Sequence, residues 1–133
     1  MVVQLVASKN ERKERNDQLN HASNFINKIA LPVRDGILFL TVDDIICFEA
    51  DGMYTKVHSK SKGVILISKP LKHFDNLMKN KPLFFRPHRS FLINLNHIKQ
   101  FIKKDGAYIV MENELAVSIS KEKREEFLEL MYY

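Results

Sequence analysis

The sequence predicts a mostly β domain of the α+β class, in which short, mainly antiparallel strands are accompanied by small helices. Short runs of apolar or alternating residues recur along the chain, as expected for strands. Asp-Gly pairs, which suit tight hairpins, separate several of these runs, at residues 35–36, 51–52 and 105–106. Apolar residues at helical spacing are found in three short segments.

The expected strands succeed one another over most of the chain. Alternation is clearest after the second Asp-Gly pair, where Tyr54 and Lys56 would share one face and Thr55 would lie on the other. The segments predicted to form strands are 28–42 (as a hairpin), 43–50, 53–59, 63–68, 97–104, 107–112 and 115–119.

Two small helices are expected within this β domain. Residues 68–82 have Ser68 as a cap at the start, and apolar residues recur at helical spacing behind it. That predicted apolar face consists of Leu71, Phe74, Leu77 and Met78. Residues 120–133 form the second predicted helix, with Ser120 as its cap.

The first part of the chain differs in composition from the remainder. Residues 1–27 carry mixed charges, contain no Gly or Pro, and place sparse apolar residues at helical spacing from Leu19 onward. We interpret residues 1–27 as a linker helix or a flexible tail. Residues 28–133 are interpreted as the folded domain.

The composition is that of an ordinary globular protein, with 45% hydrophobic and 28% charged residues in a chain of 133. No apolar run approaches the roughly 20 residues that a membrane helix needs, and the N-terminus does not resemble a secretory signal. The single cysteine, Cys47, falls in an apolar run, which favours a small core residue over a nucleophile. A lone thiol also fits a reducing cytoplasm.

Positive charge is concentrated in one part of the chain. Between Met53 and Lys104 there are twelve Lys or Arg and one acid, Asp75, whereas the remainder has nine bases and fifteen acids. Such a block creates a field that attracts polyanions and speeds their encounter. Nucleic acid is the first candidate partner, and an anionic membrane surface is the second.

Residues 84–101 set four polar residues between two apolar clusters: Arg86, His88, Arg89 and Ser90. Catalysis fits them poorly, because neighbours along a strand point to opposite faces and the basic block offers only Asp75 as an acid. The four glycines of the chain form neither a nucleophile elbow nor a phosphate-cradling loop. We therefore expect that the protein is not an enzyme.

A metal site is not expected either. The five histidines show no paired ligand spacing, and one cysteine cannot complete a structural zinc site. His58 and His97 are expected at exposed strand ends, and His73 on the polar side of its helix. The sequence thus predicts neither a metal nor another cofactor.

Binding of nucleic acid suits this stretch better. Arg offers a planar fork that matches a phosphate or the O6 and N7 atoms of guanine. Ser90, Asn94 and Asn96 can add short hydrogen bonds, and the apolar residues between them would anchor the segment to the core. Duplex DNA is favoured over RNA, because Tyr54 and Tyr108 are the only plausible platforms for stacking unpaired bases.

Alternatives stay open for the whole surface and for single residues. A basic interaction or membrane-surface module would use the same face without base selectivity. His88 could shape the loop through a hydrogen bond inside the protein instead of touching DNA. Asn94 could cap the turn "NLNH" instead of contacting phosphate.

At these residues the sequence resembles the LytTR DNA-binding domain of bacterial transcription regulators. The segment "FFRPHRSFLINLNHI" is similar to the most characteristic stretch of that family, and "DDIICFEADGMYTKVH" resembles its upstream strand and first recognition loop. "ISKPLKHFDNLM" resembles its intervening helix, and "LAVSISKEKREEF" its terminal strand and helix. The similarity runs from about Ile29 to the end of the chain.

The resemblance implies an elongated arrangement of about ten short strands whose loops enter successive major grooves of double-stranded DNA bearing direct repeats. The first loop would contribute Tyr54, Thr55 and Lys56, the second Arg86, His88 and Arg89, and the third residues 118–121. Arg89 stands where a base-reading side chain is expected. The full set of predicted DNA-binding residues is Tyr54, Thr55, Lys56, Arg86, His88, Arg89, Ser90, Asn94, Ser120 and Lys121.

The chain departs from the family in its third loop. Where members commonly have Arg, this chain has Ile119 or Ser120, which leaves Lys121 with a phosphate contact. Such domains commonly follow a receiver domain in two-component response regulators, for which this chain has no room. It is therefore expected to be an excised output domain or a stand-alone cytoplasmic regulator, with a dimer on DNA as one option.

Overall fold

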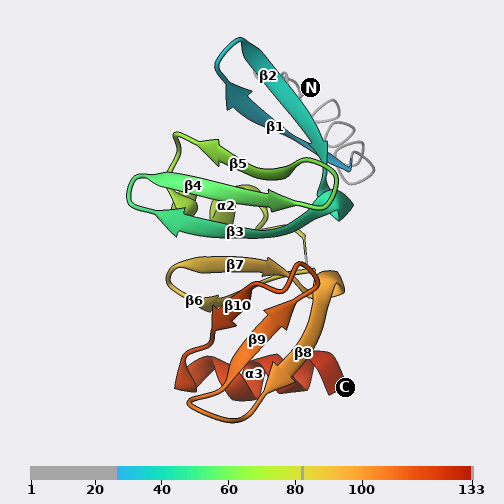
Figure 1. Cartoon of the computed structure of the whole chain (residues 1–133), viewed down its shortest axis with the longest axis vertical. Helices are drawn as coiled ribbons and strands as arrows, with labels where there is room; N and C mark the ends of the chain where they lie inside the picture. Colours follow the sequence, from blue (N-terminus) through green and yellow to red (C-terminus); the bar gives the residue numbers. More distant parts are fainter. Residues whose placement is uncertain (1–26, 82, 133) are drawn as a thin grey trace, which may run out of the picture. The chain divides into compact units, whose positions relative to one another are not determined.

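The computed structural model describes residues 27–81 and 83–132 of the chain (Figure 1). These residues form ten strands, β1 to β10, and two α-helices, α2 and α3, and every strand pairing is antiparallel. The predicted fold class is therefore confirmed. The chain divides into two compact units, residues 1–43 and 44–133.

The described part of the first unit is a hairpin of β1 (Lys28–Val33) and β2 (Gly36–Thr41). Alternation buries Leu31 on one face and leaves Phe39 exposed on the other. The predicted linker helix or tail lies, apart from Asn27, outside the described residues. The proposed domain boundary at residue 28 therefore stays a prediction.

The second unit is built on a five-stranded sheet with the strand order β5-β4-β3-β7-β6. Its strands are β3 (Ile45–Asp51), β4 (Tyr54–Ser59), β5 (Gly63–Ile67), β6 (Phe84–His88) and β7 (Phe91–Asn94). The central strand β3 pairs with β4 on one side and with β7 on the other. This pairing joins two regions that are about 40 residues apart in sequence into one sheet.

A smaller sheet comes next in the chain, with the strand order β10-β9-β8. Its strands are β8 (Ile98–Ile102), β9 (Tyr108–Met111) and β10 (Ala116–Ser118), and the helix α3 (Lys121–Tyr132) comes directly after them. Side chains from both sheets and from α3 form one buried cluster: Ile46, Cys47, Phe85, Ile93, Ala107, Ile109, Met111, Val117, Ile119 and Phe127. This core fixes the start of α3 relative to β6.

The helix α2 (Leu71–Leu77) packs on the five-stranded sheet. Phe74 is fully buried, and its ring stacks on Phe48 of β3 with centroids 4.8 Å apart. The helix departs from prediction at two points, because Pro70 occupies the cap position in place of Ser68 and Leu77 is exposed. No helix of the described residues has the length and apolarity needed to cross a bilayer.

Cys47 is a core residue, as predicted. It is fully buried in β3, and burial together with the negative charge of Glu49 raises the pKa of its thiol to about 12. A thiol with so high a pKa forms almost no thiolate at neutral pH. Cys47 therefore packs as a small apolar residue of the core.

Candidate nucleic-acid interface

Residues 87–90, which we call the 87–90 turn, comprise the end of β6 and the two residues before β7, and main-chain hydrogen bonds fix both of their ends. The N–H of Ala50, at the end of β3, donates to the carbonyl oxygen of Ser90 at 2.8 Å. The N–H of Ser120, just before α3, donates to the carbonyl oxygen of Pro87 at 3.0 Å. These bonds bring the three predicted contact segments, namely the β3–β4 turn, the 87–90 turn and the β10–α3 junction, to one edge of the second unit (Figure 1).

Arg86 has a structural role that the sequence did not predict. Its Nη1 donates to Oδ2 of Asp75 at 2.6 Å and its Nη2 to the carbonyl oxygen of Arg89 at 2.7 Å. A longer bond of 3.3 Å runs from its Nε to the carbonyl oxygen of His88. Three of its five N–H donors are thus engaged by the protein and hold the 87–90 turn, and the predicted contact of Arg86 with DNA stays a prediction.

His88 takes part in shaping the same turn. Its Nδ1 accepts a hydrogen bond from the backbone N–H of Ser90 at 3.2 Å, and its ring lies 6.4 Å from that of Phe91. Because Nδ1 accepts, the neutral ring carries its proton on Nε2. The structure therefore contains the internal hydrogen bond that the sequence left as an alternative, and it leaves Nε2 as a donor.

Arg89 is the exposed residue of the 87–90 turn, whereas Ser90 is half-buried. The carbonyl oxygen of Arg89 is held by Arg86, so the backbone that carries its side chain is fixed. An exposed guanidinium on a fixed backbone has the geometry that bidentate recognition of a base or a phosphate requires.

A groove of about 420 Å³ adjoins the 87–90 turn. It is lined by Arg86, Pro87, His88, Arg89, Ser120, Glu122 and Lys123. The sequence prediction missed Glu122 and Lys123, although both come just after the third predicted segment, within the first turn of α3. The groove therefore joins the second segment to the helix start through cationic side chains and one carboxylate.

The β3–β4 turn supplies the first predicted segment. Gly52 has a φ of 63° there, a left-handed conformation that glycine adopts without strain. Tyr54 comes two residues later and is 47% exposed, but Thr55 is fully buried and its hydroxyl donates to the carbonyl oxygen of Lys69 at 2.7 Å. The prediction that Thr55 touches DNA is thus corrected, because its side chain faces the α2 side of the sheet.

Lys56 lies on the same face of the sheet as His88. In register, His88 pairs with Phe91, and Phe91 pairs with Glu49. Glu49 pairs in turn with Lys56. Since directly opposed residues point to the same face, Lys56 and His88 are separated on it by three strand spacings, or about 14 Å.

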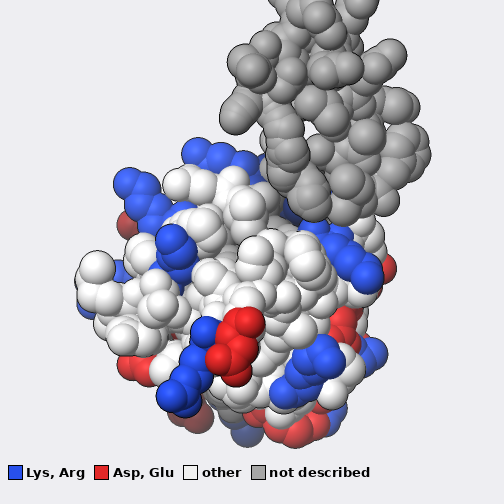
Figure 2. Space-filling view, turned by 90° about the horizontal axis from the view of Figure 1, so that it is seen from above, with Lys and Arg blue, Asp and Glu red and all other residues white. Residues whose placement is uncertain are grey.

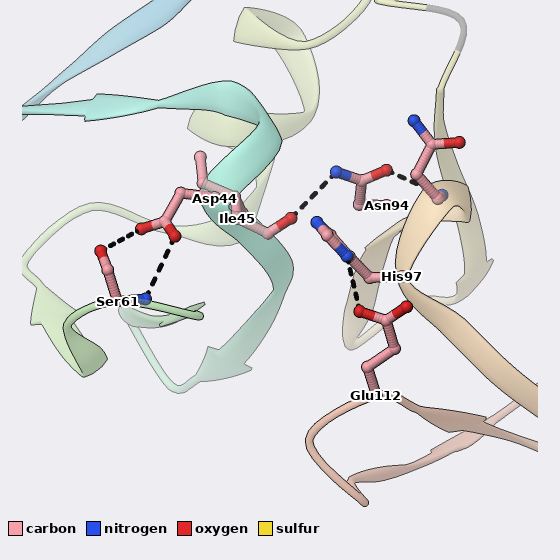
Figure 3. A network of polar contacts seen from close by, with 7 residues as sticks. Asp44, Ile45, Ser61, Asn94, His97 and Glu112 are labelled. Atoms are coloured by element: carbon pink, nitrogen blue, oxygen red, sulfur yellow. Dashed lines mark hydrogen bonds and ion pairs between the residues drawn. The ribbon is translucent and has the colours of Figure 1, made fainter.

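The predicted contact of Asn94 with DNA is also wrong. It is fully buried, and its Nδ2 donates to the carbonyl oxygen of Ile45 at 3.0 Å (Figure 3). Its Oδ1 accepts from the backbone N–H of Asn96 at 2.9 Å, which caps the short 3₁₀ turn Leu95–His97. The alternative of a turn cap is therefore confirmed for Asn94, and a phosphate contact is excluded by burial.

The β10–α3 junction carries the third predicted segment. Ile119 belongs to the buried core, so Ser120 is the half-buried position at the surface and Lys121 is exposed. The buried side chain of Ile119 cannot reach a base. The side chain of Ser120 is much shorter than that of the Arg expected in the family. Lys121 remains the cationic residue of this segment.

Two histidines are buried, contrary to prediction. Nε2 of His58 lies 2.9 Å from Oε1 of Glu49. Nδ1 of His97 lies 2.8 Å from Oε1 of Glu112, as Figure 3 shows. Pairing with a carboxylate satisfies the ring nitrogen and offsets the cost of burial. Over residues 27–81 and 83–132, no group of three or more His, Cys, Asp or Glu is placed so that it could hold a metal ion.

On the face drawn in Figure 2, the positive charges do not form one continuous patch. Lys and Arg side chains are spread around that face, and Asp and Glu side chains lie between some of them. On this face the chain therefore offers separate cations, each with its own surroundings. Local geometry, more than total charge, decides which of them can bind a partner.

Comparison with known proteins identifies the family. The LytTr DNA-binding domain family matches residues 35–132. A solved LytTr DNA-binding domain from Bacillus cereus superimposes with a TM-score of 0.66 at 25% identity, covering 81% of this chain and 99% of that domain.

Two relatives match over most of the chain. The sensory transduction protein LytT of Oceanobacillus iheyensis is 29% identical over 94 residues, which is 70% of this chain and 38% of LytT. The CO-responsive transcriptional regulator RcoM of Rhodospirillum rubrum is 26% identical over 113 residues, which is 84% of this chain and 47% of RcoM. The matched region thus spans less than half of each relative.

Proposed function

This chain belongs to the family of LytTr DNA-binding domains, and we propose that it binds double-stranded DNA sequence-specifically and regulates transcription. The observation that carries the proposal is the pair of main-chain hydrogen bonds that tie Ala50 and Ser120 to the 87–90 turn. Segments held together in this way can approach one duplex as a unit. No catalytic role is part of the proposal.

The proposed base reader is Arg89. Its side chain is exposed on a fixed turn, and the Arg fork matches guanine O6 and N7 in the major groove. His88 adds a donor, because its Nδ1 accepts from Ser90 and its Nε2 can then donate to a base or a phosphate oxygen. Each good bidentate contact of this kind discriminates against a wrong base by about 1–3 kcal/mol.

The remaining candidates are assigned to the DNA backbone. Lys56, Lys121 and Lys123 provide charge, whereas Tyr54, Ser90 and Ser120 provide neutral hydrogen-bonding groups. Contacts to phosphate orient a protein on the duplex and carry no direct sequence information. Lys56 and His88 are about 14 Å apart on one face, so they would contact different positions along a groove.

The biological setting is also a proposal. LytT is described as a sensory transduction protein and RcoM as a CO-responsive regulator, and each is more than twice as long as the region matched. We propose that this chain supplies the DNA-binding part of a comparable cytoplasmic regulator controlled by an input domain. From the resemblance to the family, we expect a DNA target with direct repeats and a dimer on DNA.

Competition binding tests the proposed function. The full chain is bound to a fluorescent duplex and challenged at matched ionic strength with unlabelled duplexes of different sequence and with anionic vesicles. Duplexes should differ in competing power by about a hundredfold or more, and vesicles should compete weakly. Equal competition by all duplexes and by vesicles would instead support a basic interaction or membrane-surface module.

A further inference from the structure

Asp75 is an exception in its surroundings. It is the one acid between Met53 and Lys104, a stretch with twelve Lys or Arg. Its side chain is 35% exposed, on the helix α2. A carboxylate in such a block weakens the attraction of phosphate, so charge alone gives no reason for its presence.

The carboxylate of Asp75 engages the residue that shapes the 87–90 turn. Its Oδ2 accepts from Nη1 of Arg86 at 2.6 Å, and this side chain of Arg86 is 31% exposed. The preceding residue on the helix, Phe74, is fully buried against Phe48 of β3. Asp75 is therefore held at a fixed place beside the sheet, and it fixes one end of the guanidinium.

The other end of the guanidinium holds the turn itself. Nη2 of Arg86 donates to the carbonyl oxygen of Arg89, and Nε donates to that of His88. Arg has five donors in a rigid plane, so a partner for Nη1 also sets the direction of Nε and Nη2. Without Asp75, the guanidinium is free to turn towards a phosphate and to release both carbonyl groups.

We propose that Asp75 is a positioning residue which, through Arg86, fixes the 87–90 turn and thereby determines base selectivity. The inference rests on the proposed function, because it concerns how Arg89 reads DNA. Asp75 itself touches no DNA. It lowers the affinity for unrelated duplexes and thereby raises the preference for the correct one.

A positioning role and a purely electrostatic role predict different changes in the DNA affinities of Asp75→Asn. If Asp75 matters through its charge alone, its neutralisation tightens binding to every duplex by the same factor. If it positions Arg86, binding to unrelated duplexes tightens while binding to the preferred duplex does not. The ratio of the two affinities should then fall by about tenfold, the loss expected for one charge-assisted hydrogen bond.

The experiment measures dissociation constants of the full chain for its preferred duplex and for a scrambled duplex. The variants are Asp75→Asn, Asp75→Glu, which keeps the carboxylate, and Arg86→Lys, which keeps the charge but loses the fork. Glu129→Gln makes the same charge change as Asp75→Asn at an exposed position of α3. Selectivity should fall for Asp75→Asn and Arg86→Lys, recover at least partly for Asp75→Glu, and stay unchanged for Glu129→Gln.

A second measurement monitors the turn without DNA. The Nε–H resonance of Arg86 and the amide resonance of Ser90 should both shift in Asp75→Asn, and backbone resonances of the smaller sheet should stay in place. A folded Asp75→Asn protein with unchanged Arg86 and Ser90 resonances, or with unchanged selectivity, would overturn the positioning role. A wild-type protein without any sequence preference would instead overturn the proposed function on which this inference rests.

Discussion

The backbone N–H of Ser120 donates a hydrogen bond of 3.0 Å to the carbonyl oxygen of Pro87. This bond joins the start of α3 to the turn that carries Arg89, although more than 30 residues separate them in sequence. Burial of Ile119 in the core holds the same junction from the inside. Two of the three segments proposed to contact DNA are therefore held together, and the proposed recognition of a particular duplex relies on this arrangement.

Replacing Arg89 by Ala should reduce sequence preference. The variant loses the proposed bidentate contact, so discrimination at one base pair should fall by about 1–3 kcal/mol. Arg34→Ala is the matched control, because Arg34 is exposed in the β1–β2 turn and its loss changes the charge equally. The measurement is the affinity for duplexes that differ at single positions, and intact discrimination in Arg89→Ala would show that another residue reads the base.

Replacing Lys56 by Ala should weaken binding to all duplexes alike. A phosphate contact carries no sequence information, so affinities for preferred and scrambled DNA should fall together. The slope of log affinity against log salt concentration should also become shallower by about 1. A change in base preference without a change in slope would place Lys56 in the groove instead of at the backbone.

The roles of the two ring nitrogens of His88 should be separable by substitution. In His88→Asn, the side-chain oxygen can replace Nδ1 as the acceptor for the N–H of Ser90, but nothing replaces Nε2. We expect this variant to keep the turn and its amide resonances and to bind DNA more weakly. His88→Ala should lose both the hydrogen bond that holds the turn and the contact with DNA. Unchanged DNA affinity in a folded His88→Asn protein would remove His88 from the contact surface and leave it the shaping role alone.

Replacing Asn94 by Ala should reduce stability and leave the DNA preference of the folded protein unchanged. The variant leaves the carbonyl oxygen of Ile45 without its partner in a buried position, which should cost about 1–3 kcal/mol. Urea unfolding measures this loss. Asn96→Ala is the control, since Asn96 is exposed and its side chain should contribute less than about 0.5 kcal/mol. Equal stability of the two variants would contradict the structural role of Asn94.

His73 should make stability depend on pH in mildly acidic solution. Burial, and secondly the positive charge of Lys69, lower the pKa of His73 from its ordinary value of 6.5. The unfolded chain therefore binds a proton more readily than the folded one, so this group reduces stability as the pH falls below about 6.5. Wild type should lose more unfolding free energy than His73→Gln between about pH 7 and about pH 5.5. Parallel pH curves for the two proteins would contradict this.

Local sequence patterns were sufficient to predict most of the elements. The segment predicted as a strand over residues 53–59 is observed as Tyr54–Ser59, and the helix predicted over 120–133 is observed as Lys121–Tyr132. Alternation, helical spacing and turn residues act over a few positions, so they can be recognised without knowing the fold. The prediction of Ser68 as the helix cap was wrong because Pro70, two residues later, occupies the cap position of α2.

The roles of polar residues were harder to predict because they depend on distant parts of the chain. Asn94 donates to the carbonyl oxygen of Ile45, 49 residues away in sequence, and Thr55 donates to that of Lys69, which lies between β5 and α2. Arg86 likewise finds its carboxylate on α2. The residue type and spacing of each fit a surface contact equally well, and only the folded structure distinguishes the two.

The groove shows a further limit of the sequence-based prediction. Glu122 and Lys123 line it together with His88 and Arg89, because the core sets the start of α3 beside the 87–90 turn. The resemblance to the family ended its third loop at Lys121. The helical period just beyond that loop was the available indication, since the first turn of a helix presents several consecutive residues towards its N-terminal end.

Sequence-specific recognition can be tested by selecting duplexes from a random pool with the full wild-type chain. Successive rounds should enrich one common motif, and the enriched pool should bind much more tightly than the starting pool at physiological salt. Repeating the selection with Arg89→Ala should blur that motif at one position. Enriched duplexes without a shared sequence, bound no better than the starting pool, would contradict sequence-specific recognition by this surface.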